Sequence, residues 1–228
     1  MKANIIDRNK YNSKIAGAFF ISATSTAIIA VILYSEFINR SNYFEGIIPA
    51  KQVITGVIFE LFLACSNIGT AVMLYPYLKR FNESAGLGYV MFRTLEVIFI
   101  LISAISVLTI LTLAQNNISS NLEENNSILH IGKVFKSIHE WVNILGPNFM
   151  LGINTFIYSA IFFKTALVPR SLAIYGLISA ILIFLVAILG IFGLFNQFSA
   201  TSLILSFPIF SYEMILAGWL IKKGFNVS

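Results

Sequence analysis

Residues 87–113 read LGYVMFRTLEVIFILISAISVLTILTL. The stretch is longer than the roughly 20 apolar residues that an α-helix needs to cross the hydrocarbon layer of a bilayer. Arg93 and Glu96 are its charged residues. The sequence therefore predicts a transmembrane helix that carries an arginine and a glutamate into the membrane.

Other apolar runs of comparable length lie on both sides of this one. Of the 228 residues, 57% are hydrophobic and 11% are charged, whereas a soluble domain has roughly 25% charged residues. The excess apolar surface must face lipid. We predict an all-α fold, a polytopic transmembrane helix bundle, with residues 1–228 forming a single integral membrane domain. The predicted spans, about six, are residues 15–34, 53–75, 87–113, 141–163, 172–195 and 203–221.

The distribution of lysine and arginine predicts the orientation of the chain. If the spans alternate, the N-terminal segment, the connections after the second and fourth spans, and the C-terminal tail share one side. The cations on that side are Lys2, Arg8, Lys10, Lys14, Lys79, Arg80, Lys164, Arg170, Lys222 and Lys223. By the positive-inside rule, both termini are predicted to be cytoplasmic. No small-x-small cleavage pattern follows the first apolar run, so we interpret it as a retained helix and not as a cleavable signal peptide.

The outer connection, residues 115–140, has two predicted parts. Its first part is rich in asparagine and serine and indicates a loop. In its second part, apolar residues recur at helical spacing with charges between them, which predicts an amphipathic helix on the outer leaflet that runs into the fourth span. Gly146 and Pro147 then predict a kink or restart, and Pro208 predicts a bend in the sixth span.

Polar residues inside the spans are the candidates for a functional site. Charged groups in a bilayer cost several kcal/mol each unless they are paired, neutralised or beside a polar cavity. Arg93 and Glu96 are three residues apart and can form an ion pair on one helix. One arginine cannot neutralise three glutamates, so a glutamate is protonated or a cation shares the site. The candidate binding or proton-exchange residues are Glu60, Asn67, Arg93, Glu96, Asn154 and Glu213.

Two interpretations of this polar group remain open. In one, Glu213 is the functional carboxylate, because the nearest cation on its own helix is Lys222, whereas Glu96 has Arg93 one turn away. In the other, the residues form an inert polar clasp that fixes helix rotation and register. Glu60 is expected nearer the outer half of the membrane, on one helix face with Asn67.

Several kinds of chemistry are not indicated. The chain has no H-E-x-x-H zinc motif, no G-x-S-x-G elbow and no phosphate-binding glycine loop. His130 and His139 do not share a helix face and have no metal-ligand partners in sequence, so we predict no metal and no cofactor. We expect His139 to be partly exposed at the outer interface together with Asn143. Cys65 is expected to be a buried small hydrophobe.

Short sequence motifs make the chain similar to a family of bacterial multi-pass membrane proteins, domain-of-unknown-function family 4386. These motifs are Leu74-Tyr75-Pro76 with Leu78-Lys79, Gly88-Tyr89-Val90 with Phe92-Arg93 and Glu96, Leu167-Val168-Pro169-Arg170 with Gly176-Leu177-Ile178, and Glu213 with Leu216-Ala217, Trp219-Leu220-Ile221 and Lys223-Gly224-Phe225. Tyr175 and Tyr212 depart from the tryptophan and asparagine expected there, and Tyr212 is expected to affect the hydrogen bonding of Glu213. The resemblance implies a location in the bacterial inner membrane and brings no catalytic residues.

Three functional classes follow. The favoured one is a non-catalytic inner-membrane component with an intramembrane Arg/Glu cluster. The alternatives are a proton- or cation-linked transporter of an unidentified small molecule and an intramembrane enzyme. The expected partners are membrane lipids and not nucleic acid, because the cations lie in short clusters beside apolar spans.

Overall fold

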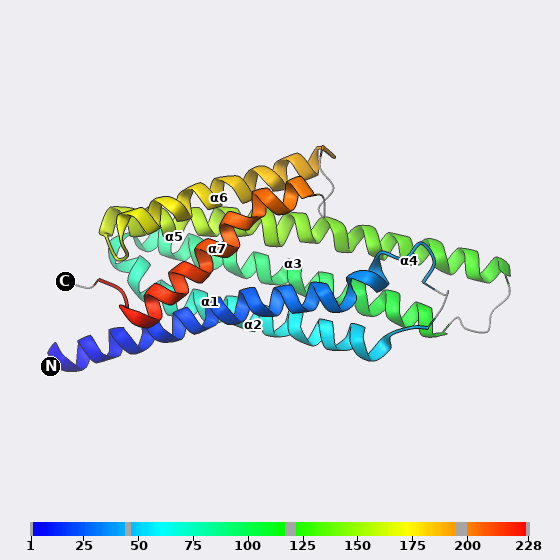
Figure 1. Ribbon diagram of the computed structural model, residues 1–228, viewed down its shortest axis with the longest axis horizontal. Helices are drawn as coiled ribbons and strands as arrows, with labels where there is room; N and C mark the ends of the chain where they lie inside the picture. Colours follow the sequence, from blue (N-terminus) through cyan, green and yellow to red (C-terminus); the bar gives the residue numbers. More distant parts are fainter. Residues whose placement is uncertain (1, 44–46, 117–121, 195–199, 227–228) are drawn as a thin grey trace.

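The computed structural model describes residues 2–43, 47–116, 122–194 and 200–226 (Figure 1). Within these ranges, every regular element is a helix. The helices are α1 (Lys2–Ile38), α2 (Ala50–Phe81), α3 (Glu83–Asn116), α4 (Leu122–Asn143), the π-helix η1 (Ile144–Met150), α5 (Leu151–Thr165), α6 (Arg170–Ile191) and α7 (Ala200–Lys222).

Six helical segments are long and apolar enough to cross a membrane, which confirms the predicted bundle. Each predicted span overlaps one of them. The first four helical segments extend beyond the predicted spans at both ends, whereas α6 ends at Ile191, before the predicted end of the fifth span. The predicted end of the fifth span at Phe195 lies outside the described residues. The segments are Asn9–Ile38, Ala50–Phe81, Glu83–Asn116, Ser127–Thr165, Arg170–Ile191 and Ile204–Lys222.

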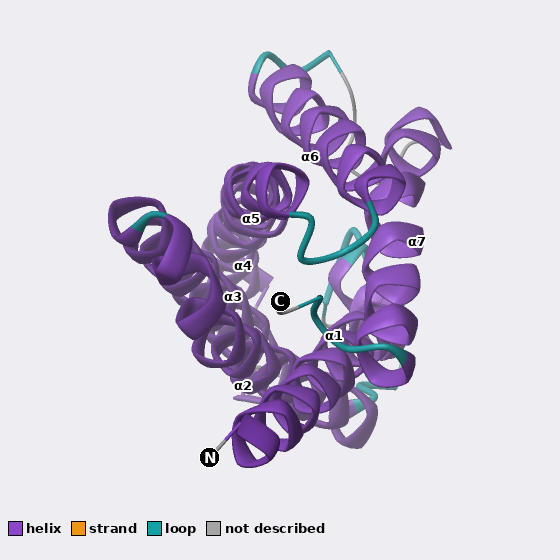
Figure 2. Cartoon of the chain, turned by 90° about the vertical axis from the view of Figure 1, so that its left-hand side faces the viewer, coloured by secondary structure: helices purple, strands orange, loops and turns teal. Residues whose placement is uncertain are grey.

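The helices form a closed ring. Consecutive spans pack against one another, and α7 returns against α1. Figure 2 shows this ring from the end at which both termini lie, which we name the terminal end. At the opposite, distal end, α2, α3 and α4 extend beyond α6 and α7 (Figure 1). The ring therefore includes α6 and α7 in the terminal half, whereas these two helices do not reach the distal end.

An aromatic core fills the terminal half of the ring. Tyr158 lies at its centre, with ring centroids 5.6 Å from Tyr89 and 6.2 Å from Tyr212. The C-terminal segment folds back under the ring, where the Phe225 ring lies 4.3 Å from Tyr77 and 5.6 Å from Phe162. Aromatic side chains thus close the bundle at the terminal end.

The fourth span is one continuous helical path through α4, η1 and α5. Proline lacks a backbone N–H, and a π-helical turn is one way to continue a helix past that gap. Pro147 lies inside η1, so the predicted irregularity is confirmed there. α7 continues through Pro208 without a break. The backbone oxygen of Pro208 accepts hydrogen bonds from the hydroxyls of Ser179 at 3.1 Å and Ser211 at 3.0 Å.

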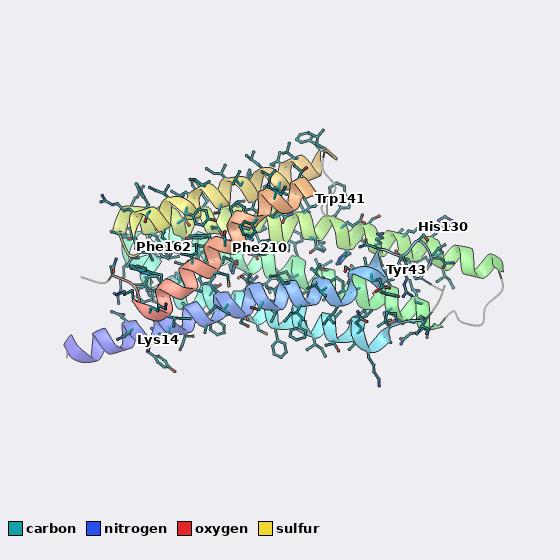
Figure 3. The ribbon with its side chains drawn as sticks, in the orientation of Figure 1. Lys14, Tyr43, His130, Trp141, Phe162 and Phe210 are labelled. Carbon is teal, nitrogen blue, oxygen red and sulfur yellow. The ribbon has the colours of Figure 1, made fainter. Side chains whose placement is uncertain are left out.

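The predicted amphipathic helix corresponds to α4, which runs alongside α3 as an extension of the fourth span and not across the end of the bundle. Leu129 and Phe135 pack against the distal core of α1, α2 and α3. The opposite face is open, with Val134 58% exposed. Figure 3 shows His130 on the outside of α4 near its distal end, where its side chain is exposed.

Large apolar side chains also cover the outside of the spans, as Phe210 and Trp141 illustrate in Figure 3. Cys65 belongs to this outer surface, since its side chain is exposed. The prediction of a buried Cys65 is therefore wrong. In a bilayer an apolar residue is equally suited to the lipid and to the core, so composition does not decide which way a small apolar residue faces.

Two glycines on neighbouring helices provide a matched test of this packing. A Cβ at Gly176 of α6 would overlap Ser159 and the Tyr212 ring, whereas a Cβ at Gly218 of α7 would meet nothing within 4 Å. We expect Gly176→Ala to lower the stability of the folded protein by about 1–3 kcal/mol, because overpacking strains a filled core. Gly218→Ala should leave stability unchanged or raise it slightly, because alanine favours the helix. Thermal unfolding of both variants in one detergent tests the packing, and equal shifts would contradict it.

Candidate functional site

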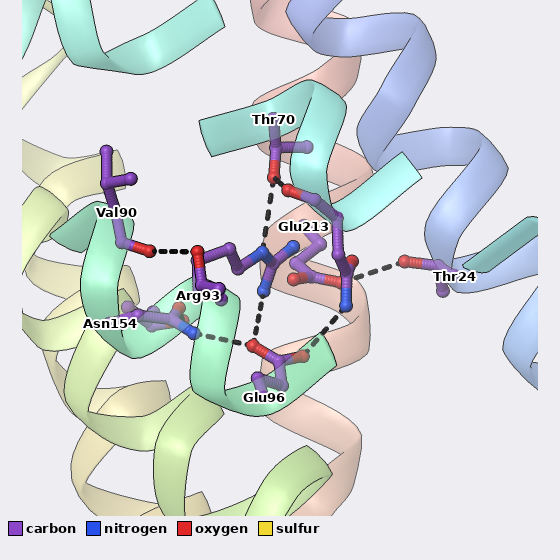
Figure 4. A network of polar contacts seen from close by, with 10 residues as sticks. Thr24, Thr70, Val90, Arg93, Glu96, Asn154 and Glu213 are labelled. Carbon is purple, nitrogen blue, oxygen red and sulfur yellow. Dashed lines mark hydrogen bonds and ion pairs between the residues drawn. The ribbon is translucent and has the colours of Figure 1, made fainter. Parts of the chain in front are cut away.

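The charged pair of α3 is buried inside the ring. Arg93 is 1% exposed and Glu96 is 3% exposed. Arg93 Nη1 donates to Glu96 Oε2 at 3.0 Å, one helical turn along α3 (Figure 4). The predicted pairing of Arg93 with a carboxylate is confirmed at Glu96.

Two amides from other helices complete the hydrogen bonding of Glu96. Asn67 of α2 donates to Glu96 Oε1 at 3.0 Å, and Asn154 of α5 donates to Glu96 Oε2 at 2.6 Å. Arg93 Nε donates to the hydroxyl of Thr70 on α2 at 3.2 Å. We name Asn67, Thr70, Arg93, Glu96 and Asn154 the polar clasp. It joins α2, α3 and α5 around a neutral ion pair.

Glu213 lies next to the clasp and has different partners. Its Oε2 accepts a hydrogen bond from Thr24 of α1 at 2.8 Å, and Figure 4 shows Thr24 and Glu213 on the side of the clasp formed by α1 and α7. Figure 4 shows Glu213 near Arg93, but Glu213 makes no ion pair among the residues that the structure describes. This second carboxyl, 6% exposed, therefore has a single side-chain donor within the described ranges.

Tyr212, one of the departures from the family pattern, does not bond to Glu213. Its hydroxyl is 3.0 Å from Ser159 Oγ on α5. Tyr175, the other departure, bonds through its hydroxyl to Ser211 of α7. Both tyrosines therefore connect helices of the terminal half, and the expected effect of Tyr212 on the hydrogen bonding of Glu213 is not observed.

Glu60 belongs to a separate group nearer the distal end. Its Oε1 accepts hydrogen bonds from Tyr34 at 3.1 Å and from Ser103 at 2.8 Å. Ser103 Oγ is also 3.0 Å from His139 Nδ1 on α4. Asn143 donates to the backbone oxygen of His139 at 2.7 Å. We name Tyr34, Glu60, Ser103, His139 and Asn143 the distal cluster.

The distal cluster corrects two expectations. His139 is 4% exposed and not partly exposed at an interface. Asn143 is half-buried and bonded within the bundle. The physical reason is the rotation of α4 about its axis, which turns Gly132, His139 and Asn143 towards α3 and the chain around Tyr43. Gly132 allows this approach, because a Cβ there would lie only 3.1 Å from the Tyr43 ring.

A small pocket opens beside this cluster. Its volume is about 60 Å³, and it lies between α1 and α4. Tyr34, His139 and Asn143 line it together with Val31, Ser35, Ile38, Asn39 and Glu140. Near the distal end, burial raises the pKa of the Tyr43 phenol, and the negative charge of Glu140 raises it further. The carboxylate of Glu140 thus lies at the pocket and acts on the nearby Tyr43 phenol.

The structure divides the predicted site residues. It brings Asn67, Arg93, Glu96 and Asn154 into the clasp, places Glu213 beside it, and places Glu60 in the distal cluster. Sequence reasoning missed the hydroxyls and the histidine that serve as partners: Thr24, Tyr34, Thr70, Ser103 and His139. Of these partners, only His139 could have been found from the sequence. It follows Gly132 by seven residues, which places both on one face of a helix. Among the described residues, no group of three histidines, cysteines, aspartates or glutamates is arranged to hold a metal ion.

These features define the chain as an all-α multi-pass membrane protein with a buried polar network centred on an arginine. The chain belongs to the family described as Domain of unknown function (DUF4386), whose model matches residues 15–224. No curated protein and no solved structure matches it. The match confirms the resemblance seen in the sequence and contains the polar clasp, Glu213 and the distal cluster.

Asn154 provides a test of the clasp. It is 0% exposed and bonds Glu96, so Asn154→Ala should lower stability by about 1–3 kcal/mol, the usual cost of removing a partner from a buried polar group. Asn148 is half-buried on η1 and makes none of the clasp contacts described above, so Asn148→Ala is the matched control. Thermal unfolding of both variants decides the matter. A smaller shift for Asn154→Ala than for Asn148→Ala would be incompatible with this geometry.

Proposed function

We propose that this chain is a non-catalytic, multi-pass component of the bacterial inner membrane, in which the polar clasp fixes the helices in one arrangement. The observation that carries the proposal is the set of protein donors that hold both oxygens of Glu96. Its two carboxylate oxygens accept hydrogen bonds from Arg93, Asn67 and Asn154, which come from three helices. Both oxygens of this carboxylate are therefore held by protein donors, which is typical of a structural ion pair.

The energetics support a structural role for the clasp. An unpaired charge inside a membrane costs several kcal/mol, and a buried pair that loses one partner is strongly destabilising. Rotation of α2 or α5 about its axis would remove an amide from Glu96, and rotation of α2 would also remove the Thr70 hydroxyl from Arg93. The clasp thus favours one rotation of each helix, a specificity that apolar packing in lipid supplies only weakly.

The orientation of the chain is part of the proposal, with both termini in the cytoplasm. Its support is the concentration of cations at the terminal end, including Lys79 and Arg80 in the last turn of α2, Lys164 and Arg170 around the α5–α6 connection, and Lys222 at the end of α7. The positive-inside rule assigns such an end to the cytoplasm. The bacterial location is supported by the family resemblance.

Cysteine labelling tests this orientation. In a Cys65→Ala background, a cysteine at Ser84 should be protected from a membrane-impermeant maleimide added to intact cells, whereas one at Ile47 should react, because both positions are exposed but at opposite ends. Asn121, in the predicted outer connection, would be an equivalent outer position but lies outside the described residues. Labelling at Ser84 together with protection at Ile47 would show that the orientation is the reverse of the one proposed.

A second candidate function is a proton- or cation-linked transporter. The observation that favours it is Glu213, a second buried carboxyl near Arg93 that has one side-chain donor, Thr24, where Glu96 has three. One guanidinium neutralises one carboxylate, so Glu213 either carries a proton or attracts a cation.

Glutamine substitutions distinguish the two functions. Under the structural proposal, Glu96→Gln should lower the yield of folded protein severely, because the charge of Arg93 is left uncompensated. Glu213→Gln should fold normally, since an amide can still accept from Thr24. The measurements are folded yield by size-exclusion chromatography and any proton-coupled signal in reconstituted vesicles. A wild-type proton signal that disappears in well-folded Glu213→Gln would support the transporter and contradict the non-catalytic proposal.

A further inference from the structure

The pocket between α1 and α4 is connected to Glu60 by hydrogen bonds. Glu60 itself does not line the pocket, but Tyr34 and His139 do. Tyr34 bonds Glu60 directly at 3.1 Å. His139 reaches it through Ser103, with 3.0 Å between His139 Nδ1 and Ser103 Oγ and 2.8 Å between Ser103 Oγ and Glu60 Oε1. A buried carboxyl is therefore in contact with the pocket through side chains alone.

The two oxygens of Glu60 are not equivalent. Oε1 accepts both hydrogen bonds, whereas Oε2 is buried and has no hydrogen-bond partner among the described residues. Glu60 as a whole is 4% exposed. Burial of a carboxylate oxygen without a hydrogen-bond donor raises the free energy of the folded protein. Protonation of the carboxyl would remove the charge that this unpaired oxygen shares.

The direction of the hydrogen bonds follows from the number of protons available. A carboxylate can only accept, so the single hydroxyl proton of Ser103 points to Glu60. Ser103 Oγ must then accept from His139, which places the proton of the neutral imidazole on Nδ1. Nε2 is left as an acceptor, and the amide of Asn143 lies 3.4 Å from it. Each group in the chain is thus poised to give its proton to the next one inward.

We propose that Glu60 is a proton-binding site that exchanges protons with the distal pocket through Ser103 and His139. A hydronium ion in the pocket gives a proton to His139 Nε2 and becomes water. The proton on Nδ1 passes to Ser103 Oγ, and the hydroxyl proton of Ser103 passes to Glu60 Oε1, the oxygen to which it is hydrogen-bonded. No electrons are transferred; Glu60 ends as a neutral acid and His139 as the Nε2–H tautomer. The reverse sequence returns the proton to the pocket.

This site is separate from the polar clasp. Glu60 and Asn67 are seven residues apart, roughly 10 Å along α2 at about 1.5 Å per residue. Asn67 bonds Glu96, while Glu60 bonds Tyr34 and Ser103. In the part of the chain that the structure describes, no hydrogen bond joins the two groups. Glu60 therefore exchanges with the distal side and does not pass its proton to Arg93 or Glu96, as suits a sensor of distal acidity.

The ionisable groups around Glu60 must stay unchanged when the proton path is tested. Tyr34 faces Glu60 from α1, and His139 faces it from α4 through Ser103 of α3. At the pocket, Glu140 lies 4.0 Å from Lys136 in an exposed ion pair on α4. Variants of Ser103 change no ionisable group, so they alter the connection and leave these charges in place.

The test follows protonation of Glu60 by infrared spectroscopy after a rapid drop in pH, with the protein in lipid nanodiscs. The carboxylic-acid band that is missing in Glu60→Gln reports on Glu60. We expect Ser103→Ala to slow the appearance of this band by roughly a hundredfold, the lower range of what a positioned proton-transfer group contributes. Ser106→Ala is the matched control, because Ser106 is buried on α3 but bonds only the backbone oxygen of Ile102. Its rate should equal that of the wild type.

An unchanged rate in Ser103→Ala, or the absence of a pH-dependent band from Glu60, would overturn the proposal. If Ser103→Ala does not fold, the wild-type protein provides an independent measurement. The chain has two histidines, so ¹⁵N NMR of the wild type and of His130→Gln assigns the His139 signals. The proposal requires the Nδ1–H tautomer while Glu60 is ionised, and an Nε2–H tautomer would overturn it. Neither measurement depends on the clasp, so failure here leaves the proposed function intact.

Discussion

The guanidinium of Arg93, 1% exposed inside a bundle of membrane-spanning helices, imposes the constraint on which the rest of the structure depends. A permanent positive charge in a low-dielectric interior must be matched by a negative charge within contact distance. Glu96 supplies it at 3.0 Å from the next turn of the same helix. The local pair then needs donors for the remaining lone pairs of Glu96, and only neighbouring helices can supply them.

The positions of α2 and α5 follow from that requirement. Asn67 and Asn154 must face Glu96 from opposite sides, which turns both helices to a defined rotation and brings them against α3. α1 and α7 are joined next to this group through Thr24 and Glu213. The distal cluster repeats the same principle with α1, α2, α3 and α4, where Tyr34, Ser103 and His139 gather around Glu60. Between the clasp and the distal cluster, Ala64, Val97 and Ile100 form a small aliphatic core cluster.

The sequence predicted the features that depend on local geometry. Apolar run length placed six spans, and the three-residue spacing of Arg93 and Glu96 placed their ion pair. Features that depend on helix rotation were harder to predict. Glu60 and Asn67 lie on one face of α2, yet that face meets different neighbours along its length, so the two residues belong to different groups. Cys65 and His139 were misplaced for a related reason, since lipid and protein interior are both apolar and hydrophobicity alone does not orient a helix.

The coupling free energy between Arg93 and Glu96 tests the central claim most directly. It is obtained from a double-mutant cycle of Arg93→Met, Glu96→Gln and the double variant, with reversible unfolding measured in one lipid or detergent mixture. Each single variant leaves a buried charge or an incomplete network, so it should lose about 3 kcal/mol or more, whereas the double variant is neutral and should recover most of that loss. Losses that simply add in the double variant would show that Arg93 and Glu96 do not compensate each other and would contradict the account.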